Sequence, residues 1–409
     1  MHRIGAVTIA VVATFAVAAA VGSAAAPASA ARLGCGAIIK TDTKLDSDLN
    51  NCPGNGIVIG ADNITLDLNG HTIGGDGVPA GACFDEGICD LGISNDAGHA
   101  GVTITGGAVR GFDIGISVLG GSANRVQRVG LADNSTFGVM AGDSTAIRID
   151  HNLSVDEGIS GIVMFDSSNS RVDHNSVTGA HGYGIAAFGS SHNRLERNLL
   201  AGNDHGILLD SSDNNEVHGN RISHSGGSSI DIGHSSENRV GENVLSNNGD
   251  GVILFEAHAN LISDNAVTGT GLFGFPDAGG FGLILDGADD NVVLRNSVTG
   301  GRGPAILVSS LDSMETSDRN VFVRNVANSS LADGIVVAGN ATATVLKGNT
   351  ASENGDDGIR VDAAGTTLTR NTANFNHDLG IEAVPGVIDG GGNRARGNGN
   401  PLQCTNVAC

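Results

Sequence analysis

The sequence predicts a single-domain, all-β protein that winds as a right-handed parallel β-helix. Three observations support this fold class: a unit of 22–23 residues recurs along the chain, apolar and polar residues alternate within each unit, and aromatic residues are scarce. With 63 glycines, one tyrosine and no tryptophan, the chain must fill its core with isoleucine, valine, leucine and alanine. If neighbouring coils lie ~4.8 Å apart, about 13–14 coils form a rod roughly 65 Å long.

The first thirty residues have the features of an export signal. Arg3 is followed by the apolar segment Ile4–Val21, and Ala28–Ala30 fits the small-x-small rule for signal peptidase. We therefore expect a signal peptide at residues 1–30 and a secreted or cell-envelope protein. An uncleaved anchor is the alternative, because the apolar segment is nearly long enough to span a bilayer. No comparable segment follows, so we do not expect the mature chain to be an integral membrane protein.

The cysteines lie outside the central repeats and form three close pairs in the sequence. An exported chain meets an oxidising compartment, so we expect disulfides rather than a metal site, although six cysteines allow fifteen pairings. The three pairs are Cys35 with Cys52, Cys83 with Cys89, and Cys404 with Cys409.

The repeat is marked by a small residue at the start of a strand. Successive markers are 22–24 residues apart, except for steps of 31 and 29 residues, which predict loops at Gly271–Gly280 and Ser313–Asp318. The markers are Gly115, Gly138, Gly161, Gly184, Gly206, Ser229, Gly251, Gly282, Ala305, Gly334, Gly358 and Gly380. We divide the chain into the signal peptide (1–30), an N-terminal cap with the first coils (31–95), the β-helix repeats (96–385) and a C-terminal cap with a disulfide (386–409).

Asparagines recur with the same period and predict ladders at the corners between strands. Asparagine tolerates the left-handed backbone that we expect at these corners, and its amide can bond to the asparagine of the next coil. One ladder runs through Asn152, Asn175, Asn198, Asn220, Asn243, Asn265, Asn296, Asn325, Asn349 and Asn371, and a second through Asn169, Asn193, Asn215, Asn238, Asn260, Asn291 and Asn320.

Three segments together resemble bacterial right-handed β-helix repeat proteins of the pectate-lyase-like superfamily. They are the opening Ile64–Ile73, the unit typified by Gly161–Asn175, and the ending Asp389–Asn393. The resemblance covers about residues 55–400 and implies the fold. It implies a range of functions, since the superfamily contains polysaccharide lyases, hydrolases, uronate epimerases, tailspikes, adhesins and a periplasmic maturation factor for a copper enzyme. Fold analogy alone does not choose among them.

The motif Arg-x-Asp-His-Asn gives the first group of candidate site residues. Its charged side chains flank a buried position, so they point outward in adjacent columns and could bind sugar hydroxyls and carboxylates. An ion-pair lattice on a solvated face is the alternative. The candidate substrate-binding residues are Arg148, Asp150, His151, Arg171, Asp173, His174 and Arg194.

The only tyrosine gives the second group. Tyr183 immediately precedes the marker Gly184, and His205 holds the same place one coil later, with His181 nearby. Abstraction of a proton beside a uronate carboxyl needs a base and an acid, so Tyr183, His205 and His181 are candidate catalytic residues. Packing of the ring at a glycine-rich corner is the alternative.

The charge and composition limit the partners. A net charge of -22 without a basic run argues against nucleic acid, and it repels polyanionic glycans unless a cation such as calcium bridges them. No two cysteines have the C-x-x-C spacing of a metal site, and no cofactor motif is evident. By ligand type, His151 and His174 with Asp150 and Asp173 could hold a transition metal. The paired-aspartate pattern of galacturonan hydrolases is not reproduced, because Asp289–Asp290 occurs beside a ladder corner without the other motifs of that family. The alginate-epimerase signature of Tyr-Gly near Asp-Pro-His is also missing.

One column between the buried positions of the first strand is apolar although we expect it to face outward. An exposed apolar stripe indicates a partner surface, a covering segment such as Gly77–Ser94, or self-association. The column contains Met140, Val163, Ala186, Leu208, Ile253, Ile284, Leu307 and Val336.

The sequence therefore favours a secreted protein that binds or processes extracellular or cell-wall polysaccharide, with lyase or epimerase chemistry on an acidic glycan as the enzymatic form. A non-enzymatic envelope scaffold or adhesin is the alternative.

Overall fold

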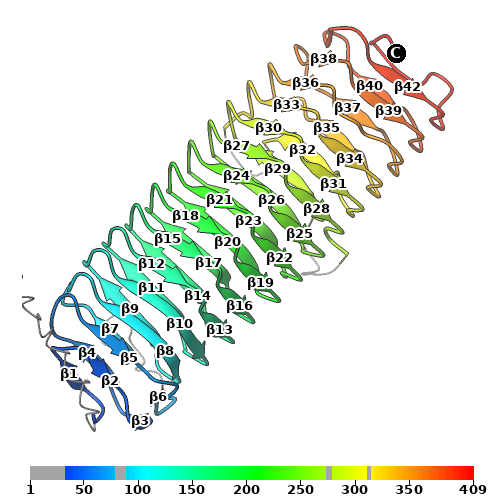
Figure 1. The fold of residues 1–409 in the computed structure, drawn as a ribbon. Coiled ribbons are helices and arrows are strands. Elements are labelled where there is room, and N and C mark those ends of the chain that lie inside the picture. Colours follow the sequence, from blue (N-terminus) through cyan, green and yellow to red (C-terminus); the bar gives the residue numbers. More distant parts are fainter. Residues whose placement is uncertain (1–32, 79–88, 273–278, 311–314) are drawn as a thin grey trace, which may run out of the picture.

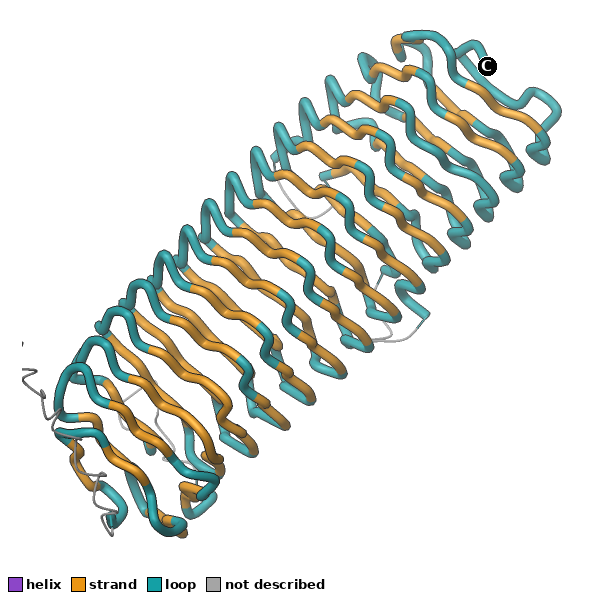
Figure 2. The backbone as a smooth tube through the Cα atoms, in the orientation of Figure 1, coloured by secondary structure: helices purple, strands orange, loops and turns teal. Residues whose placement is uncertain are grey.

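The computed structural model describes residues 33–78, 89–272, 279–310 and 315–409. Within these ranges every regular element is a β-strand, and the strands wind into an elongated solenoid (Figure 1). Each typical coil contributes three short strands joined by tight corners, so strands and loops alternate in register along the rod (Figure 2). The chain is thus a right-handed parallel β-helix, as the repeat predicts. The predicted signal peptide, Cys83 and parts of the two predicted loops lie outside the described ranges.

The long sheet consists of fifteen parallel strands, one from each coil. Strands at the N-terminal end precede the first marker, Gly115, which explains why the coils outnumber the 13–14 that we expected. The strands are β1 (Ala37–Ile39), β4 (Ile57–Ile59), β7 (Leu91–Asn95), β9 (Ile114–Leu119), β11 (Phe137–Gly142), β14 (Ser160–Phe165), β17 (Tyr183–Phe188), β20 (His205–Asp210), β23 (Ser228–Gly233), β26 (Asp250–Phe255), β29 (Leu283–Asp286), β32 (Ile306–Ser309), β35 (Ile335–Val337), β37 (Ile359–Val361) and β40 (Ile381–Ala383).

The first short row follows the long sheet within each coil. It consists of β2 (Thr43–Lys44), β5 (Thr65–Asp67), β8 (Thr103–Arg110), β10 (Arg125–Ala132), β12 (Arg148–Asp150), β15 (Arg171–Asp173), β18 (Arg194–Glu196), β21 (Glu216–His218), β24 (Arg239–Gly241), β27 (Leu261–Ser263), β30 (Val292–Leu294), β33 (Val321–Val323), β36 (Val345–Lys347), β38 (Thr367–Thr369) and β41 (Ile388–Asp389).

The second short row completes the coil. It consists of β3 (Leu49–Cys52), β6 (Thr72–Gly75), β13 (Leu153–Val155), β16 (Ser176–Thr178), β19 (Leu199–Ala201), β22 (Arg221–Ser223), β25 (Val244–Ser246), β28 (Ala266–Thr268), β31 (Ser297–Thr299), β34 (Val326–Asn328), β39 (Thr372–Asn374) and β42 (Arg394–Arg396). The longer strands β8 and β10 run through both rows and pair with members of each.

The core lies inside the coils and consists of the predicted apolar columns. In the long sheet Ile162 pairs with Ile185, and Ile185 with Ile207, and all three are fully buried. The same holds for Val172 and Leu195 in the first short row. Because β-branched and leucine side chains stack on similar side chains of the neighbouring coil, each coil covers the apolar surface of the coil before it.

The asparagine ladders are present, but their backbone differs from our expectation. Asn198 is buried, its carbonyl oxygen accepts hydrogen bonds from the backbone and amide nitrogens of Asn175, and its own amide donates to the Val172 carbonyl. The left-handed residue is the one before the ladder position, such as His174 (φ 58°) and Arg197 (φ 53°). Asn169 (φ 54°) likewise precedes the ladder, and Ser170 takes the ladder position in that coil.

Two predicted disulfides are confirmed: Cys35 bonds to Cys52, and Cys404 to Cys409. Cys89 is also disulfide-bonded, while Cys83 lies outside the described residues. Among the described residues, no helix has the length and apolar character needed to cross a membrane.

Candidate functional site

Tyr183 and His205 begin adjacent strands of the long sheet and lie side by side on its outer face. Tyr183 is the register partner of His205, and the ring centroids are 4.9 Å apart with the planes inclined at 32°. Ile185 and Ala187 on the same strand belong to the inner core, whereas Tyr183 packs among residues of the outer face. The structure therefore brings together the pair that the sequence suggested.

Two residues of the next strand, β23, support the His205 ring. Its Nδ1 lies 3.0 Å from the Ser228 hydroxyl oxygen and 3.5 Å from Oδ2 of Asp231. The Ser228 hydroxyl also donates a hydrogen bond to Asp231. The carboxylate thus holds both the hydroxyl and the imidazole, which is the arrangement that orients a histidine acting as a base.

The acidic surroundings shift the protonation of this group. The hydrogen bond with Asp231 raises the pKa of His205, although burial opposes it. Burial, followed by the charge of Asp231, raises the pKa of Tyr183, so its hydroxyl keeps its proton. Asp250, on the following strand, also has a raised pKa because of burial, and one of its oxygens accepts a hydrogen bond of 2.8 Å from the Phe281 backbone.

His181 has a different position from the other two candidates. It is exposed at the corner before β17, where its backbone N–H donates to the Glu157 carbonyl. The Tyr183–His205 ring stack does not include it.

An apolar surface adjoins the stacked pair on the outer face. Phe165 and Phe188 stack at 5.3 Å and are partly exposed. Leu91, Ile114, Phe137, Val163 and Ala186 form a second, buried cluster against which Tyr183, Met140, Phe165, Phe188 and Leu208 pack.

The prediction of an exposed apolar stripe was wrong in part. Val163 and Ala186 are fully buried, Leu307 and Val336 are nearly so, and Met140, Leu208, Ile253 and Ile284 are half-buried. Neighbouring side chains of the outer face cover the column: Phe165 and Phe188 pack in the same cluster as Val163 and Ala186. Cys89 and Leu91, from the segment expected to form a cover, belong to this cluster, and residues 79–88 lie outside the described ranges.

The arginine, aspartate and histidine motif forms an ion-pair ladder on the first short row. Asp173 is fully buried and receives a two-fold hydrogen bond from Arg148 at 3.0 Å, an ion pair from Arg171 at 3.1 Å and a contact from His174 at 2.8 Å. Arg125 and His151 bind Asp150 in the same way.

These contacts occupy most of the charged groups of the motif, so few of them remain to bind a ligand. The arginines lower the pKa of Asp150 and Asp173 and hold them as buried carboxylates. Arg194 contacts Glu196 and Glu216, and it lines a pocket of about 390 Å³ together with His192 and Arg239. The whole motif lies on a different sheet from Tyr183 and His205, so these arginines do not serve the stacked pair.

A second group of carboxylates lies farther along the rod and was missed by the sequence analysis. Oxygens of Asp333, Asp356 and Asp357 lie within 4.8 Å of one another. Burial and a hydrogen bond with Glu382 raise the pKa of Asp357 to about 7. Oxygen ligands of this kind suit calcium. The group is five to six strands from β20 in the long sheet, so an ion held there would not reach a sugar bound at Tyr183.

Two families match parts of the sequence. Residues 87–226 match the family described as periplasmic copper-binding protein (NosD), and residues 195–276 and 275–373 match the right-handed beta helix region. A comparison with the curated proteins finds no match.

Solved structures with the same fold include polysaccharide enzymes. A mutant of the periplasmic alginate epimerase AlgG is 13% identical, with a TM-score of 0.51 over 85% of this chain and 78% of that one. The catalytic domain of an alpha-1,3-glucanase in complex with nigerose is also 13% identical, with a TM-score of 0.59 over 72% of this chain and 64% of that one. At this identity the likeness concerns the fold.

The copper-binding description can be tested against the residues in the matching segment. Copper favours imidazole and sulfur ligands that converge on one point. Within the described ranges no group of three histidines, cysteines or carboxylates converges between residues 87 and 226. His151 and His174 stack in parallel at 4.9 Å, and each Nδ1 is engaged by an aspartate. These residues do not fit a copper centre.

Proposed function

Because the chain is a right-handed parallel β-helix protein of the pectate-lyase-like superfamily, we propose that it binds an extracellular polysaccharide across the outer face of its long sheet and processes it at Tyr183, His205 and Asp231. The observation that carries this proposal is the stacking of the two rings at 4.9 Å with a carboxylate behind the imidazole. The disulfides and the polysaccharide-acting structural neighbours support an exported protein with this class of ligand.

The apolar surface beside the pair suits a sugar ring. The partly exposed faces and edges of Phe165 and Phe188 offer carbon-rich contact, while the hydroxyls of the sugar remain free for polar partners. The two rings lie on adjacent coils, ~4.8 Å apart along the rod, a spacing comparable to the length of a sugar unit, and their outer register partners are Gly142 and Asp210. A chain lying along the rod would therefore place two successive units over these two coils.

The chemistry that we propose is proton abstraction beside a uronate carboxyl. Neutral His205 removes the proton, Asp231 stabilises the imidazolium that forms, and Tyr183 donates its phenolic proton to the departing glycosidic oxygen. Elimination by this route breaks the C–O bond and leaves an unsaturated sugar. Epimerisation would need a proton donor other than Tyr183 on the opposite face of the sugar, because Tyr183 lies beside His205.

The charge of the site restricts the substrate. Asp231 and Asp250 lie near the imidazole, and the arginines of the ion-pair ladder lie on another sheet. A free uronate carboxylate would be repelled here. A uronate whose carboxyl is esterified avoids this repulsion, and esterification also makes the adjacent C–H more acidic. We therefore propose an esterified uronate glycan rather than free polyuronate as the substrate at this site.

The test compares free and methyl-esterified polygalacturonate, with and without calcium, by ultraviolet absorbance of the unsaturated product and by sugar analysis for epimers. We expect product from the esterified polymer and its loss in Tyr183→Phe and His205→Gln. His192→Gln, an exposed corner histidine, is the matched control. New reducing ends without absorbance would indicate hydrolysis and overturn the proposed elimination. Binding without any product would instead favour a non-enzymatic scaffold or adhesin.

A further inference from the structure

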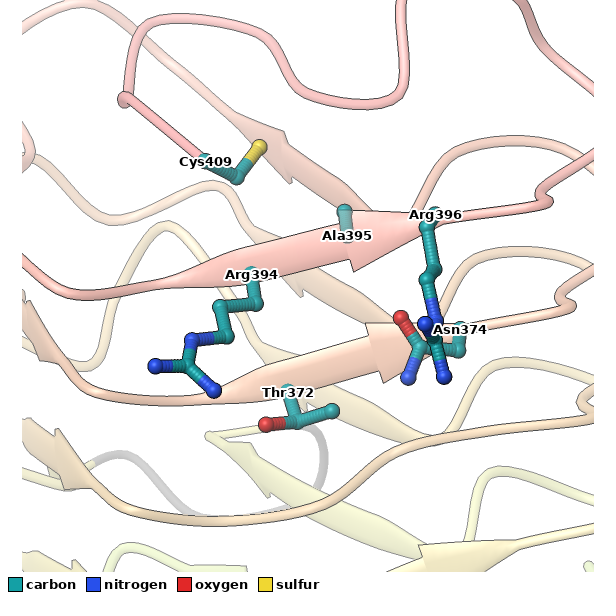
Figure 3. Close-up of a pocket in the computed structure, with 6 residues that line it drawn as sticks. All are labelled: Thr372, Asn374, Arg394, Ala395, Arg396 and Cys409. Atoms are coloured by element: carbon teal, nitrogen blue, oxygen red, sulfur yellow. The ribbon is translucent and has the colours of Figure 1, made fainter.

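A basic pocket of about 430 Å³ lies at the C-terminal end of the second short row. It is lined by Thr372, Asn374, Arg394, Ala395, Arg396 and Cys409 (Figure 3). The last coil is eight strands from β17 in the long sheet, roughly 38 Å along the rod, and the pocket lies on a different row of strands. It is therefore separate from the site proposed above.

Two arginines point out of the same strand into this pocket. Arg394 and Arg396 alternate with the inward-facing Ala395 on β42, so their side chains share one face. Thr372 is the register partner of Arg394, and Asn374 is that of Arg396. Figure 3 shows both arginine side chains extending over β39, with Arg396 beside Asn374.

These arginines are unlike the ion-paired arginines elsewhere on the rod. Both are exposed, and neither has an ion pair with a carboxylate in the described part of the chain. By contrast, the exposed Arg295 binds both oxygens of Asp264, and Arg319 binds both oxygens of Asp290. In a chain of net charge -22, these two cations lie on one face of one strand and line the same pocket.

The floor of the pocket offers uncharged polar groups. Thr372 follows Thr350 in the same column, and the Asn374 backbone N–H donates to the Ser352 hydroxyl at 3.2 Å. The side-chain oxygen of Asn374 is buried and has no hydrogen-bond partner within the described residues. A buried acceptor of this kind is usually satisfied by a donor, and movement of Arg396 onto an anion would open it to a ligand hydroxyl.

We propose that this pocket binds an anionic group, a carboxylate or a sulfate, of an acidic polysaccharide. The planar guanidinium forks of Arg394 and Arg396 bind such groups through paired hydrogen bonds, and Thr372 and Asn374 bind the neighbouring sugar hydroxyls. A polynucleotide fits less well, because no aromatic side chain lines the pocket for base stacking and the charge of the chain opposes it. The pocket thus gives the rod a second glycan site, which takes an anionic unit and not the esterified unit proposed for Tyr183 and His205.

The test uses the full chain carrying Tyr183→Phe and His205→Gln, so that turnover plays no part and the result is independent of the proposed chemistry. Fluorescent oligogalacturonate, a sulfated dextran oligosaccharide and single-stranded DNA of similar charge are titrated by anisotropy at low and at physiological ionic strength. The pocket variant is Arg394→Gln with Arg396→Gln. The control is Arg295→Gln with Arg319→Gln, which removes the same charge from two exposed arginines that already have carboxylate partners.

We expect one of the two oligosaccharides to bind, more weakly as salt rises, and which one binds identifies the anionic group. The pocket variant should lose about tenfold or more in affinity, the effect of removing charge-assisted hydrogen bonds, while the control changes less than about twofold. Equal losses in the two variants, tighter binding of DNA than of either oligosaccharide, or no binding of any probe would overturn the proposal. Thermal unfolding of both variants verifies that the fold is intact.

Discussion

Glu157 accepts two hydrogen bonds from Asn134 in a third ladder, which runs along the corner that follows the second short row. In this ladder Glu157 takes the place of an asparagine. Its Oε2 lies 3.0 Å from both the backbone and the side-chain nitrogen of Asn134, and the Ser154 hydroxyl donates to Oε1 at 2.9 Å. The side chain is fully buried, and burial raises its pKa to about 7, because loss of water outweighs these hydrogen bonds.

The raised pKa of Glu157 predicts a loss of stability as the pH rises. The folded protein holds this proton more tightly than the unfolded chain, so the stabilisation is complete below the unfolded pKa and is lost as the pH rises toward 7. Between about pH 4 and pH 8 the loss is about 3 kcal/mol. Glu157→Gln should remove this dependence in urea unfolding at several pH values. A variant that follows the wild-type pH dependence would contradict the raised pKa, and the exposed Glu353→Gln is the control.

The main asparagine ladder predicts a large cost for removing one member. Asn220 is fully buried, accepts two hydrogen bonds from Asn198 and donates to the Leu195 carbonyl at 2.8 Å. Asn220→Ala leaves these groups without partners and should lower the free energy of unfolding by about 3 kcal/mol or more. Chemical denaturation measures it. A loss no greater than that of the exposed Asn50→Ala would show that the ladder adds little.

The ion-pair ladder predicts different costs for a buried and an exposed carboxylate. Asp173→Asn leaves Arg148 and Arg171 around a neutral, buried group and should cost about 3 kcal/mol. Asp264→Asn breaks the exposed pair with Arg295 and should cost less than about 1 kcal/mol. The arginines lower the pKa of Asp173, so its contribution is present above the unfolded pKa and is lost on acidification. Parallel denaturation of the two variants tests the contrast, and equal losses would contradict it.

The contact between His205 and Asp231 predicts the pH dependence of the proposed reaction. His205 acts as a base only when neutral, so kcat/KM should rise with pH through its raised pKa. Asp231→Asn removes the main cause of that shift and should move the rise to lower pH, whereas His205→Gln should lower kcat by about 100-fold or more. Rate profiles on esterified polygalacturonate measure both effects. An unchanged midpoint in Asp231→Asn would remove His205 from the role of base.

Much of the fold follows from local spacing. The column through Ile162 and Ile185 and the ladder through Asn175 and Asn198 were predictable because successive coils have nearly equal length, which turns a sequence period into a stack. The backbone at the corners was not predictable in the same way. Either Asn175 or the preceding His174 could take the left-handed conformation, and only the hydrogen bonds of the folded corner assign it to His174.

The candidate site was predictable only in part. Tyr183 and His205 occupy the same position in successive repeat units, so the spacing predicts that they are neighbours. Asp231 was missed, although it is the first charged residue in the column of Met140 and Val163, and that interruption was the available signal. For the Arg171–Asp173 pair, both sugar binding and an ion-pair lattice were open, because sequence gives no measure of how completely neighbouring coils bury a carboxylate.

The sequence by itself determined the coil, the positions of its corners and the residues that stack from one coil to the next, because these depend on period and on the alternation of a strand. Tertiary structure alone decided which outward-facing residues remain accessible and which charges meet. Asp231 contacts His205, and Phe165 and Phe188 pack with Val163 and Ala186. These contacts form because side chains from different positions of the repeat lean across the outer face of the sheet, and the spacing of the repeat does not give the direction in which a side chain leans.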